Sequence, residues 1–238
     1  MSGDGEHWLI IPTYEEAANL EAIVGAVREE RPAPRRVLIV DDASPDGTGE
    51  IADRLAAEHD DVEVLHRAAK RGLGPAYVAG FRRALAQGAD LVAQMDADFS
   101  HDPSDLPRLV AAARDADLVL GSRYVGGGGV EEWGALRRAI SRAGSAYARG
   151  ALGVGLHDLT GGFKVFRRAV LEAIDLDSLS SLGYAFQIET TYRALRSGFR
   201  VVEVPITFRE RRVGESKMSK RIIAEAAWRV PAMRVRGR

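Results

Sequence analysis

The feature that most constrains the fold of this chain is a regular alternation between apolar runs and amphipathic stretches. Apolar runs occupy residues 8–12, 36–42, 62–66 and 91–98, and an amphipathic stretch follows each of the first three. Residues 15–30 place their apolar side chains three and four positions apart, which is the spacing of one helix face. Strands that alternate with helices in this way form βαβ units. The sequence therefore predicts an α/β fold whose mainly parallel central sheet is flanked by helices.

A change in composition after the first half of the chain bears on its domain organisation. The run Gly126–Gly134 contains five glycines, is too short for a domain linker and is predicted to be a mobile loop. A basic helix is expected over residues 135–152 and a last strand over residues 201–208. A chain of 238 residues, 46% of them hydrophobic, can bury the core of one domain. We therefore expect a single domain over residues 1–238.

Composition and the N-terminal residues exclude several classes of protein. The formal net charge of −1 gives no overall attraction for nucleic acid, and the absence of cysteine excludes disulfides and thiolate metal sites. The first residues are acidic and polar where a secretory signal is basic and then apolar, and no apolar run is long enough to span a membrane. We therefore expect a cytoplasmic protein with no nucleic-acid partner.

Polar side chains follow four of the predicted strands at the point where each strand ends. Ligands of open α/β sheets bind beyond the carboxyl ends of the strands, so these side chains are expected to form one site. They are Pro12 to Glu15 after the first strand, Asp41 and Asp42 after the second, Asp96 and Asp98 after the fourth, and Ser122 and Arg123 after the next.

The pair Asp96 and Asp98, in the stretch QMDADFSHDP, places like charges where they repel unless a cation lies between them. No glycine fingerprint for a dinucleotide follows the first strand, and no P-loop occurs. A nucleotide would then be held by side chains, with Mg²⁺ or Mn²⁺ on the two carboxylates to neutralise its phosphates. The alternative is that such an aspartate caps a helix, which is the role expected for Asp102 beside Pro103 and Ser104.

Seven motifs, in order along residues 8–218, resemble those of the family 2 glycosyltransferases. They are LIIPTYEEAANL, VLIVDDASPDGTGEIA, KRGLGPAYVAGFRRA, QMDADFSHDP, VLGSRYV, DLTGGFKVFRRAVL and VVEVPITFRERRVGESKM. Within that family they are most similar to the polyprenyl-phosphate (dolichyl-phosphate) mannose synthases. The resemblance implies a GT-A fold, GDP-mannose as donor, a polyprenyl phosphate as acceptor and inversion at the anomeric carbon. It also implies a Rossmann-like nucleotide-binding half at about residues 8–125 and an acceptor-binding half at about residues 126–218.

The resemblance gives roles on the donor side to residues that match the motifs. Pro12, Tyr14, Glu15 and Asp42 would line the nucleotide pocket. A carboxylate such as that of Asp42 suits a hydrogen bond with the base or the ribose. Asp41 either joins this set or caps the turn after its strand.

The resemblance also implies a divalent metal. Asp96 and Asp98 match the family's DxD motif, which binds the metal and the diphosphate, and Asp98 is expected to be essential for transfer. Many members carry Gln two places after the second aspartate, where this chain has Ser100. The third ligand of Mg²⁺ or Mn²⁺ is therefore Ser100, water or His101.

The acceptor phosphate should need cations and no general base. A lipid phosphate is largely ionised near neutral pH, with a second pKa of about 6 by analogy with phosphorylated side chains. Planar guanidinium groups suit its oxygens. Arg123, Arg137 and Ser141 match the family's acceptor-phosphate positions, and the last two lie one helical turn apart. Arg138 is interpreted as a solvated charge of the same helix.

A third basic group lies in the stretch FRERRVGESKM, which resembles a mobile loop that closes over the donor diphosphate. Arg212, Ser216 and Lys217 are the expected contacts. Closure would exclude water, which competes with the lipid phosphate as nucleophile. The alternative is a solvated, charged loop.

Three further groups are weaker candidates for contact with the substrates. Lys70 and Arg71 either touch the donor or remain on the surface, Gly161, Gly162 and Lys164 form a tight turn that shapes the pocket, and Gln187 and Glu189 lie on a helix near the sugar.

Residues 219–238 predict a basic amphipathic helix that ends near Pro231. Its apolar residues between 222 and 230 stand at helical spacing beside lysine and arginine. Such a helix either lies in a membrane interface or packs against its own domain. Since no transmembrane segment is encoded, we expect peripheral attachment to the cytoplasmic face of the membrane or a separate membrane-spanning partner.

Two alternative functions remain open at this point. The first is transfer of glucose from UDP-glucose to the same lipid, although the GESKM ending favours mannose. The second is a nucleotide-sugar-binding subunit without catalysis that assists a membrane glycosyltransferase. The presence of Asp96, Asp98, Arg123 and Arg137 argues against the second, because such a subunit has no chemical need for them.

Overall fold

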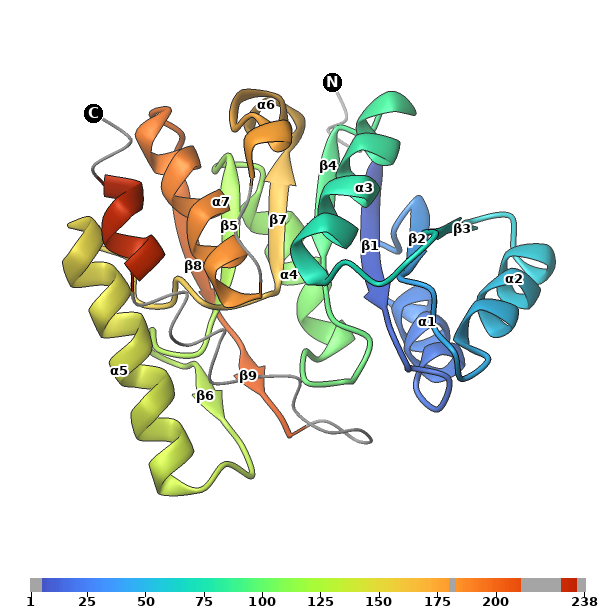
Figure 1. Ribbon diagram of the computed structural model, residues 1–238, viewed down its shortest axis with the longest axis horizontal. Helices are drawn as coiled ribbons and strands as arrows, with labels where there is room; N and C mark the ends of the chain where they lie inside the picture. Colours follow the sequence, from blue (N-terminus) through green and yellow to red (C-terminus); the bar gives the residue numbers. More distant parts are fainter. Residues whose placement is uncertain (1–5, 180–182, 211–227, 235–238) are drawn as a thin grey trace.

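The computed structural model describes residues 6–179, 183–210 and 228–234. Its centre is a seven-stranded sheet in the order β3-β2-β1-β4-β7-β5-β8, and a small second sheet pairs β6 with β9 (Figure 1). Neighbouring strands of the large sheet are parallel, except that β7 runs antiparallel to both β4 and β5.

The elements have the following bounds. The strands are β1 (His7–Thr13), β2 (Arg36–Asp41), β3 (Val62–His66), β4 (Leu91–Gln94), β5 (Leu118–Ser122), β6 (Gly129–Val130), β7 (Lys164–Arg167), β8 (Val201–Pro205) and β9 (Thr207–Phe208). The helices are α1 (Leu20–Glu29), α2 (Thr48–Glu58), α3 (Leu73–Ala86), α4 (Leu106–Ala112), α5 (Ala135–Leu152), α6 (Arg168–Ala173) and α7 (Tyr184–Arg196). Two 3-10 turns, η1 (Pro103–Asp105) and η2 (Leu176–Ser178), precede α4 and α7.

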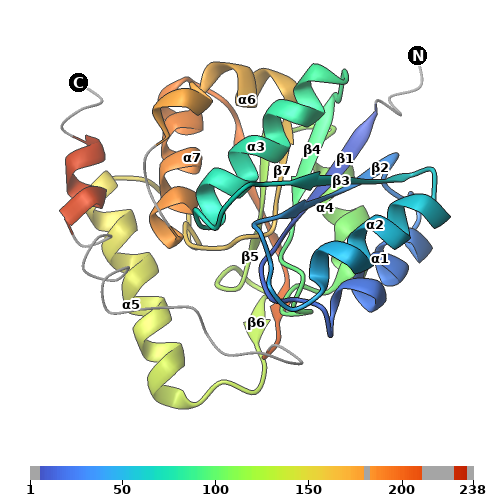
Figure 2. The ribbon, with the colours of Figure 1, turned by 45° about the vertical axis from the view of Figure 1, so that its right-hand side comes forward.

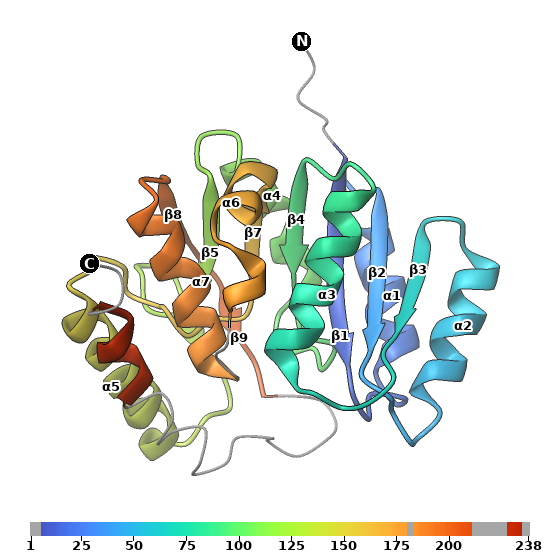
Figure 3. The same ribbon diagram turned by 45° about the horizontal axis from the view of Figure 1, so that its top comes forward.

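Helices cover both faces of the large sheet, as Figure 3 shows. On β1, Leu9 and Ile11 pack with α1, α2 and α4, whereas Trp8 and Ile10 pack with α3, α6 and α7 on the opposite face. Strands that are buried on both faces read as continuous apolar runs, which is the pattern seen in the sequence. The predicted α/β fold with a mainly parallel sheet is confirmed.

Helix α1 begins at Leu20, five residues later than the sequence pattern suggested. The backbone N–H groups of residues 15–17 donate to side chains of residues 44–48 in the neighbouring loop. Glu15 also has a positive φ of 56°, which no helix tolerates. The first residues of the predicted helix therefore form a turn at the edge of the sheet.

The glycine run after β5 is only partly irregular. Gly129 and Val130 form β6, which pairs in parallel with β9. A Cβ atom at Gly128 would lie 2.5 Å from the carbonyl oxygen of Ser122, so only glycine fits there. The predicted loop thus contains a short strand that runs close to the end of β5.

Helix α5 has the bounds that the sequence predicted, and it lies at one end of the molecule beside the helical residues 228–234 (Figures 1 and 2). Val230 packs against Ala148 of α5, and Arg234 Nη1 donates to the carbonyl oxygen of Ala151 at 3.1 Å. At these residues the C-terminal segment packs against its own domain. No helix among the described residues has the length and apolar character needed to cross a bilayer.

The prediction that Pro231 ends the C-terminal helix is wrong. Helical residues continue beyond it to residue 234. Proline removes one N–H donor, but its fixed φ is compatible with a helix. Most of the predicted tail helix lies outside the described residues.

The two predicted halves of the chain share the large sheet. Strand β7, from the predicted acceptor-binding half, lies between β4 and β5 of the predicted nucleotide-binding half. The division into halves at residue 125 stays a prediction.

Candidate active site

Five strands bring polar residues to one edge of the large sheet. The carboxyl ends of β1, β2, β4 and β5 lie at this edge because these strands share one direction. Strand β7 runs the opposite way, so its first residue lies there too. Residues 158–163, which lead into β7, therefore join the side chains that the sequence predicted for this edge.

Asp98 lies in a tight turn just beyond the end of β4. Its Oδ1 accepts hydrogen bonds from the backbone N–H of Ser100 at 3.1 Å and from the Ser100 hydroxyl at 2.6 Å. Phe99, between them, has a positive φ of 60°. Both Asp98 and Ser100 are buried. Ser100 thus fixes the orientation of the carboxylate, while its service as a metal ligand stays a prediction.

Asp96 receives a hydrogen bond from α3. The hydroxyl of Tyr77 donates to Asp96 Oδ1 at 3.1 Å. Burial of the Tyr77 ring, followed by the nearby Asp96 carboxylate, raises the pKa of Tyr77 well above its ordinary value. The phenol therefore remains a proton donor throughout the physiological pH range. The Asp98 carboxylate also raises the pKa of Tyr77, which places both acids near this hydroxyl.

His101 packs beside the segment that carries Asp96 and Asp98. Its ring lies between Phe163 and Phe208, with centroid separations of 5.3 Å and 5.2 Å. Burial lowers the pKa of His101, so the ring is neutral near pH 7. Its Nδ1 accepts the backbone N–H of Asp96 at 3.4 Å, which orients the imidazole. His101 as a third metal ligand stays one of the sequence-based alternatives.

The Asp96 and Asp98 carboxylates fit a hard divalent cation. Among residues 6–179, 183–210 and 228–234, no group of three or more His, Asp or Glu side chains is arranged to hold a metal. Mg²⁺ commonly uses one or two carboxylates together with substrate phosphates and water. The two carboxylates match this set of ligands if the phosphates of a bound nucleotide supply further oxygens. They do not match a site that is built from protein ligands alone.

Tyr14 and Glu15 occupy the turn after β1. The ammonium group of Lys70 lies 3.4 Å from the centroid of the Tyr14 ring, a cation–π contact that brings Lys70 to this edge. The backbone N–H of Glu15 donates to the Ser44 hydroxyl at 3.2 Å. Pro12 lies within β1 and is buried. These residues lie at or near the carboxyl end of β1, and their contact with a nucleotide stays a prediction.

Asp41 and Asp42 have different local roles at the end of β2. Asp41 accepts hydrogen bonds from the Ser44 hydroxyl at 2.6 Å and from the Ser44 N–H at 3.3 Å, so the alternative that Asp41 caps the turn is confirmed. Asp42 accepts from Arg67 at 2.5 Å and from the backbone N–H groups of Arg71 and Gly72. The loop that begins α3 is thereby tied to the end of β2.

Asp102 is a helix cap, as its alternative interpretation predicted. Its carboxylate accepts the N–H of Ser104 at 3.0 Å at the start of η1, with Pro103 at the first position. An ion pair of 2.6 Å joins it to Arg209.

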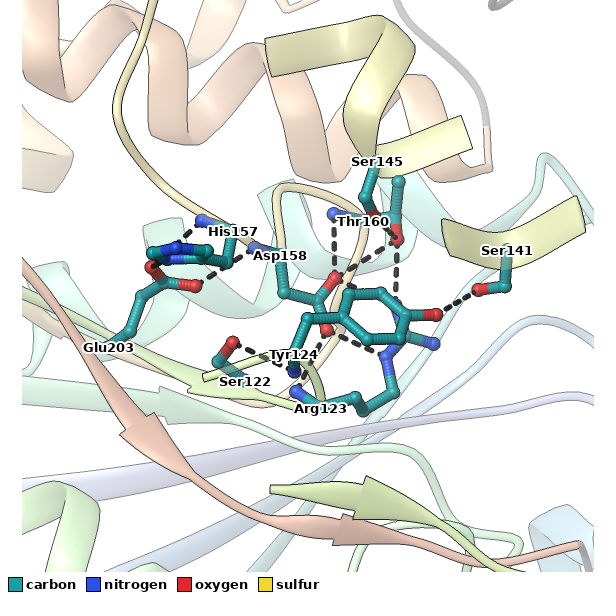
Figure 4. Close-up of polar contacts among 9 residues, drawn as sticks. All are labelled: Ser122, Arg123, Tyr124, Ser141, Ser145, His157, Asp158, Thr160 and Glu203. Atoms are coloured by element: carbon teal, nitrogen blue, oxygen red, sulfur yellow. Dashed lines mark hydrogen bonds and ion pairs between the residues drawn. The ribbon is translucent and has the colours of Figure 1, made fainter. Parts of the chain in front are cut away.

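Arg123, at the end of β5, is buried in an ion pair with Asp158 (Figure 4). Its Nε and Nη2 donate to the two Asp158 oxygens, each at 2.7 Å, and Nη2 also donates to the Thr160 hydroxyl at 2.7 Å. Burial alone would raise the pKa of Asp158, but the Arg123 guanidinium and the hydrogen bonds lower it below its ordinary value. The pair is therefore ionised at neutral pH.

Arg137 and Ser141 both lie on α5. The hydroxyl of Tyr124, the residue after Arg123, donates to Ser141 Oγ at 2.6 Å (Figure 4). The Arg137 guanidinium lies 4.1 Å from the centroid of Trp133 and forms an ion pair with Glu210. Arg138 is exposed, in agreement with its interpretation as a solvated charge.

Arg212, Ser216 and Lys217 lie outside the described residues. Their contact with the donor diphosphate stays a prediction.

The weaker candidates around β7 form a buried polar cluster. The prediction that Lys164 belongs to a tight turn is wrong, because Lys164 is the first residue of β7 and is fully buried. Its ammonium donates to the carbonyl oxygen of Gln187 at 2.6 Å and to the hydroxyl of Thr191 at 3.0 Å. Gln94 Nε2 donates both to Gln187 Oε1 and to the Gly162 carbonyl oxygen at 2.7 Å.

Sequence reasoning missed Tyr77 and Asp158. Tyr77 stands among apolar residues of α3 and carries no signal that its hydroxyl faces an acid. Asp158 precedes a strand whose antiparallel direction no apolar pattern reveals. Two signals were available: Asp158 begins the motif DLTGGFKVFRRAVL, and the spacing of Asp158 and Thr160 is the same as that of Asp98 and Ser100.

Sequence similarity to known proteins extends over most of the chain. The family model "Glycosyl transferase family 2" matches residues 8–175. The chain is 54% identical over 217 residues to an undecaprenyl-phosphate mannosyltransferase from Micrococcus luteus, an alignment that covers 91% of this chain and 89% of that protein. It is 52% identical over 232 residues to a polyprenol monophosphomannose synthase from Mycolicibacterium smegmatis, covering 97% of this chain and 87% of that protein.

Solved structures with much lower identity share the fold. A glucosyl-3-phosphoglycerate synthase from Mycobacterium tuberculosis, in complex with Mn²⁺, UDP and phosphoglyceric acid, matches with a TM-score of 0.69 at 16% identity, over 98% of this chain and 78% of that one. The mannosyltransferase PcManGT from Pyrobaculum calidifontis, in complex with GDP-Man and Mn²⁺, matches with a TM-score of 0.60 at 20% identity, over 98% and 74%. The predicted GT-A architecture is confirmed by these glycosyltransferases. With the family model matching most of its length and two relatives above 50% identity, the chain belongs to glycosyltransferase family 2.

Proposed function

We propose that this protein transfers mannose from GDP-mannose to a polyprenyl phosphate, with polyprenyl-phosphate mannose and GDP as products. The observation that carries the proposal is sequence identity. The chain shares more than half of its aligned residues with two enzymes named for polyprenyl-phosphate mannose formation, over nearly its whole length. The strand-end acids and arginines at one edge of the sheet support it independently, because the reaction must bring two anions together.

On the donor side, Pro12, Tyr14, Glu15 and Asp42 line the nucleotide pocket in this proposal. Asp96 and Asp98 hold Mg²⁺ or Mn²⁺ against the diphosphate, with Ser100 beside them. A divalent cation, when bound, neutralises the phosphates and stabilises the charge that develops on the leaving GDP. The hydrogen bonds from Tyr77 and Ser100 support this role, since they orient the two carboxylates before the substrate arrives.

On the acceptor side, Arg123, Arg137 and Ser141 bind the lipid phosphate. A phosphate oxygen attacks the anomeric carbon, the bond between that carbon and the diphosphate oxygen breaks, and its electron pair leaves with GDP. Attack from the side opposite to GDP inverts the anomeric centre. Arg212, Ser216 and Lys217 close over the diphosphate in the same proposal and exclude water.

We also propose that the protein works at the surface of a membrane, where its acceptor resides. Leu136, Ile140 and Tyr147 are 75%, 53% and 46% exposed. They lie within about 40° of one another around α5, at 3.6 residues per turn. The helix also carries four arginines and no acidic residue, a charge that suits anionic headgroups. A separate membrane-spanning partner remains the alternative means of attachment.

Sedimentation with vesicles of phosphatidylglycerol and phosphatidylethanolamine tests this location. Ile140→Ser should lower the bound fraction, whereas Ala139→Ser, on a neighbouring exposed position, should not. Equal binding by both variants would contradict a role for this face of α5.

The reaction itself is tested by transfer of labelled mannose from GDP-mannose into organic-extractable lipid, with purified protein, undecaprenyl phosphate and Mg²⁺. Label should enter the lipid phase and should disappear when EDTA removes the metal. UDP-glucose with a labelled sugar runs in parallel. Label from UDP-glucose alone would move the protein to the glucosyl reaction, and no label from either donor would favour the non-catalytic alternative.

A further inference from the structure

The side chain of Arg123 is held in one orientation by several contacts within the protein. Its Nε and Nη2 donate to Asp158, its backbone N–H donates to Asp158 Oδ2 at 3.1 Å, and its guanidinium lies 5.2 Å and 5.3 Å from the ring centroids of Tyr124 and Phe208. Its exposed fraction is only 5%. One edge of the guanidinium is therefore fixed against Asp158, and the end that carries Nη1 has a defined direction.

Asp158 is itself anchored from a different strand. Glu203 of β8 accepts the backbone N–H groups of His157 and Asp158, both at 2.8 Å, and lies 3.0 Å from His157 Nδ1 (Figure 4). Strand β8 pairs directly with β5, which carries Arg123 at its end. Glu203 thus ties the loop before β7 to the strand on the far side of β5.

The same cluster reaches α5 through two hydroxyl groups. The Thr160 hydroxyl donates to Asp158 at 3.1 Å and lies 3.3 Å from the Ser145 hydroxyl, which is on α5. Tyr124 bonds to Ser141, one turn earlier on that helix (Figure 4). A shift of Asp158 would therefore change the contacts of Arg123 and also those of α5, the helix that carries Arg137.

We infer that Asp158, anchored by Glu203, is a positioning residue that directs Arg123 toward the phosphate of the acceptor. This inference rests on the proposed function, because it takes the bound anion to be a lipid phosphate. Asp158 does not touch the substrate; it acts by fixing the guanidinium. A guanidinium that arrives already oriented loses less conformational freedom when it binds the phosphate.

A carboxylate is required at this position and an amide cannot replace it. Asp158 accepts five hydrogen bonds, three from Arg123 and two from Thr160. An asparagine would turn its own N–H₂ group toward some of these donors. Because that group cannot accept a hydrogen bond, at least one donor of Arg123 or Thr160 would lose its acceptor. The buried guanidinium would then move to find other acceptors.

The test is a comparison of Michaelis constants for wild type, Asp158→Asn and the control Asp117→Asn, with GDP-mannose and undecaprenyl phosphate varied in turn. Asp117 stands before the opposite end of β5 and accepts the Arg200 N–H at 2.8 Å. Asp158→Asn should raise KM for the lipid phosphate by about tenfold or more, the loss expected for a charged hydrogen bond, and leave KM for GDP-mannose within about twofold. Asp117→Asn should leave both constants unchanged.

Thr160→Val provides a second variant should Asp158→Asn fail to fold. It removes the hydroxyl that Arg123 Nη2 meets at 2.7 Å but keeps the shape of the side chain and the Asp158 charge. Its rise in KM should be smaller and confined to the lipid phosphate. Equal changes for both substrates, or no change, would show that the pair is only structural. A lower KM for the lipid phosphate would show that Asp158 competes with the substrate, and this too would overturn the inference.

Binding of farnesyl phosphate, measured by calorimetry, separates this inference from the proposed function. If wild type binds farnesyl phosphate and the variants bind it more weakly, the inference stands even where no mannose is transferred. If wild type transfers mannose and the variants bind farnesyl phosphate as wild type does, the inference fails and the proposed function stands. If wild type binds no farnesyl phosphate, the inference fails.

Discussion

At the scale of single residues, four aspartates share one local arrangement. In each, a serine or threonine two residues later donates its hydroxyl, and its backbone N–H, to the carboxylate. The pairs are Asp46 with Thr48, Asp98 with Ser100, Asp102 with Ser104, and Asp158 with Thr160. Such turns are formed by neighbours in the sequence and need no distant partner. Two of them, at Asp98 and Asp158, orient buried acids within the candidate active site.

Asp98→Ala should abolish mannose transfer with either Mg²⁺ or Mn²⁺. The variant removes one of the two carboxylates proposed to hold the cation on the diphosphate, and loss of such a group lowers kcat by about 100-fold or more. Activity is measured by incorporation of label into lipid at saturating metal.

Asp102→Ala is the control for that variant. It removes a helix cap with the same side chain at the same spacing, so it should cost about 1 kcal/mol of stability and leave transfer largely intact. Full activity of Asp98→Ala would remove the metal assignment.

Arg137→Ala should weaken use of the lipid phosphate and spare the donor. A hydrogen bond to a charged group contributes about 1.5–3 kcal/mol, so KM for undecaprenyl phosphate should rise about 10-fold to 100-fold. Binding of GDP, measured by calorimetry, should be unchanged. Arg138→Ala, one position along α5 and exposed, should change neither quantity. Parallel losses in GDP binding and lipid use would mean that the acceptor site lies elsewhere.

At the scale of elements, glycines decide how closely α3 approaches the sheet. A Cβ atom at Gly80 would lie 2.5 Å from Ile10 Cγ2 and 3.2 Å from Val40 Cγ2, so the helix rests directly on β1 and β2. This approach brings Tyr77, one turn earlier, under Asp96. The orientation of Asp96 in the candidate active site therefore depends on how closely α3 packs on the sheet at Gly80.

Gly80→Ala should destabilise the protein by about 1–3 kcal/mol, because overpacking a core forces side chains or backbone to move. Gly25→Ala is the matched control. Gly25 lies within α1 with nothing within 4 Å of the added Cβ, so this variant should be stabilised by about 0.5–1 kcal/mol. Urea unfolding followed by circular dichroism measures both. A stable Gly80→Ala variant would show that α3 can move away from the sheet.

The elements also show what the sequence could predict about this site. The ends of β1, β2, β4 and β5 were predictable because an apolar run followed by acids or arginine marks the end of a buried parallel strand. The contribution of β7 was not predictable, since an apolar run is the same in either direction. Lys164 was assigned to a tight turn together with Gly161 and Gly162, yet it begins β7, and Gln187, Thr190 and Thr191 surround its ammonium.

At the scale of the whole molecule, a buried lysine in the central sheet couples stability to pH. Burial, opposed by the Asp158 charge, lowers the pKa of Lys164 to about 7. In the unfolded chain the same amine keeps its proton up to about pH 10.4. Between these values the unfolded state binds more protons than the folded state, so the free energy of unfolding rises with pH.

Unfolding free energy should therefore increase by about 2 kcal/mol between pH 7 and pH 9. Lys164→Met should flatten this rise, because it removes the titrating group from the core. Lys70→Met, which changes an exposed lysine, should keep the wild-type slope. Denaturant unfolding at three pH values measures the slopes. An equal slope in Lys164→Met and wild type would assign the pH dependence to other groups.

Strand β7, the antiparallel strand of the large sheet, sets the distance between β4 and β5. Neighbouring strands lie about 4.7–4.9 Å apart, so β4 and β5, with β7 between them, are separated by about twice that distance. A sugar ring with an anionic group on either side spans more than one such interval. The width of strand β7 thus fixes the distance between the ends of β4 and β5. If Asp96 and Asp98 hold the donor and Arg123 the acceptor phosphate, as proposed, the separation of the strand ends that carry them is set by the sheet and not by the loops.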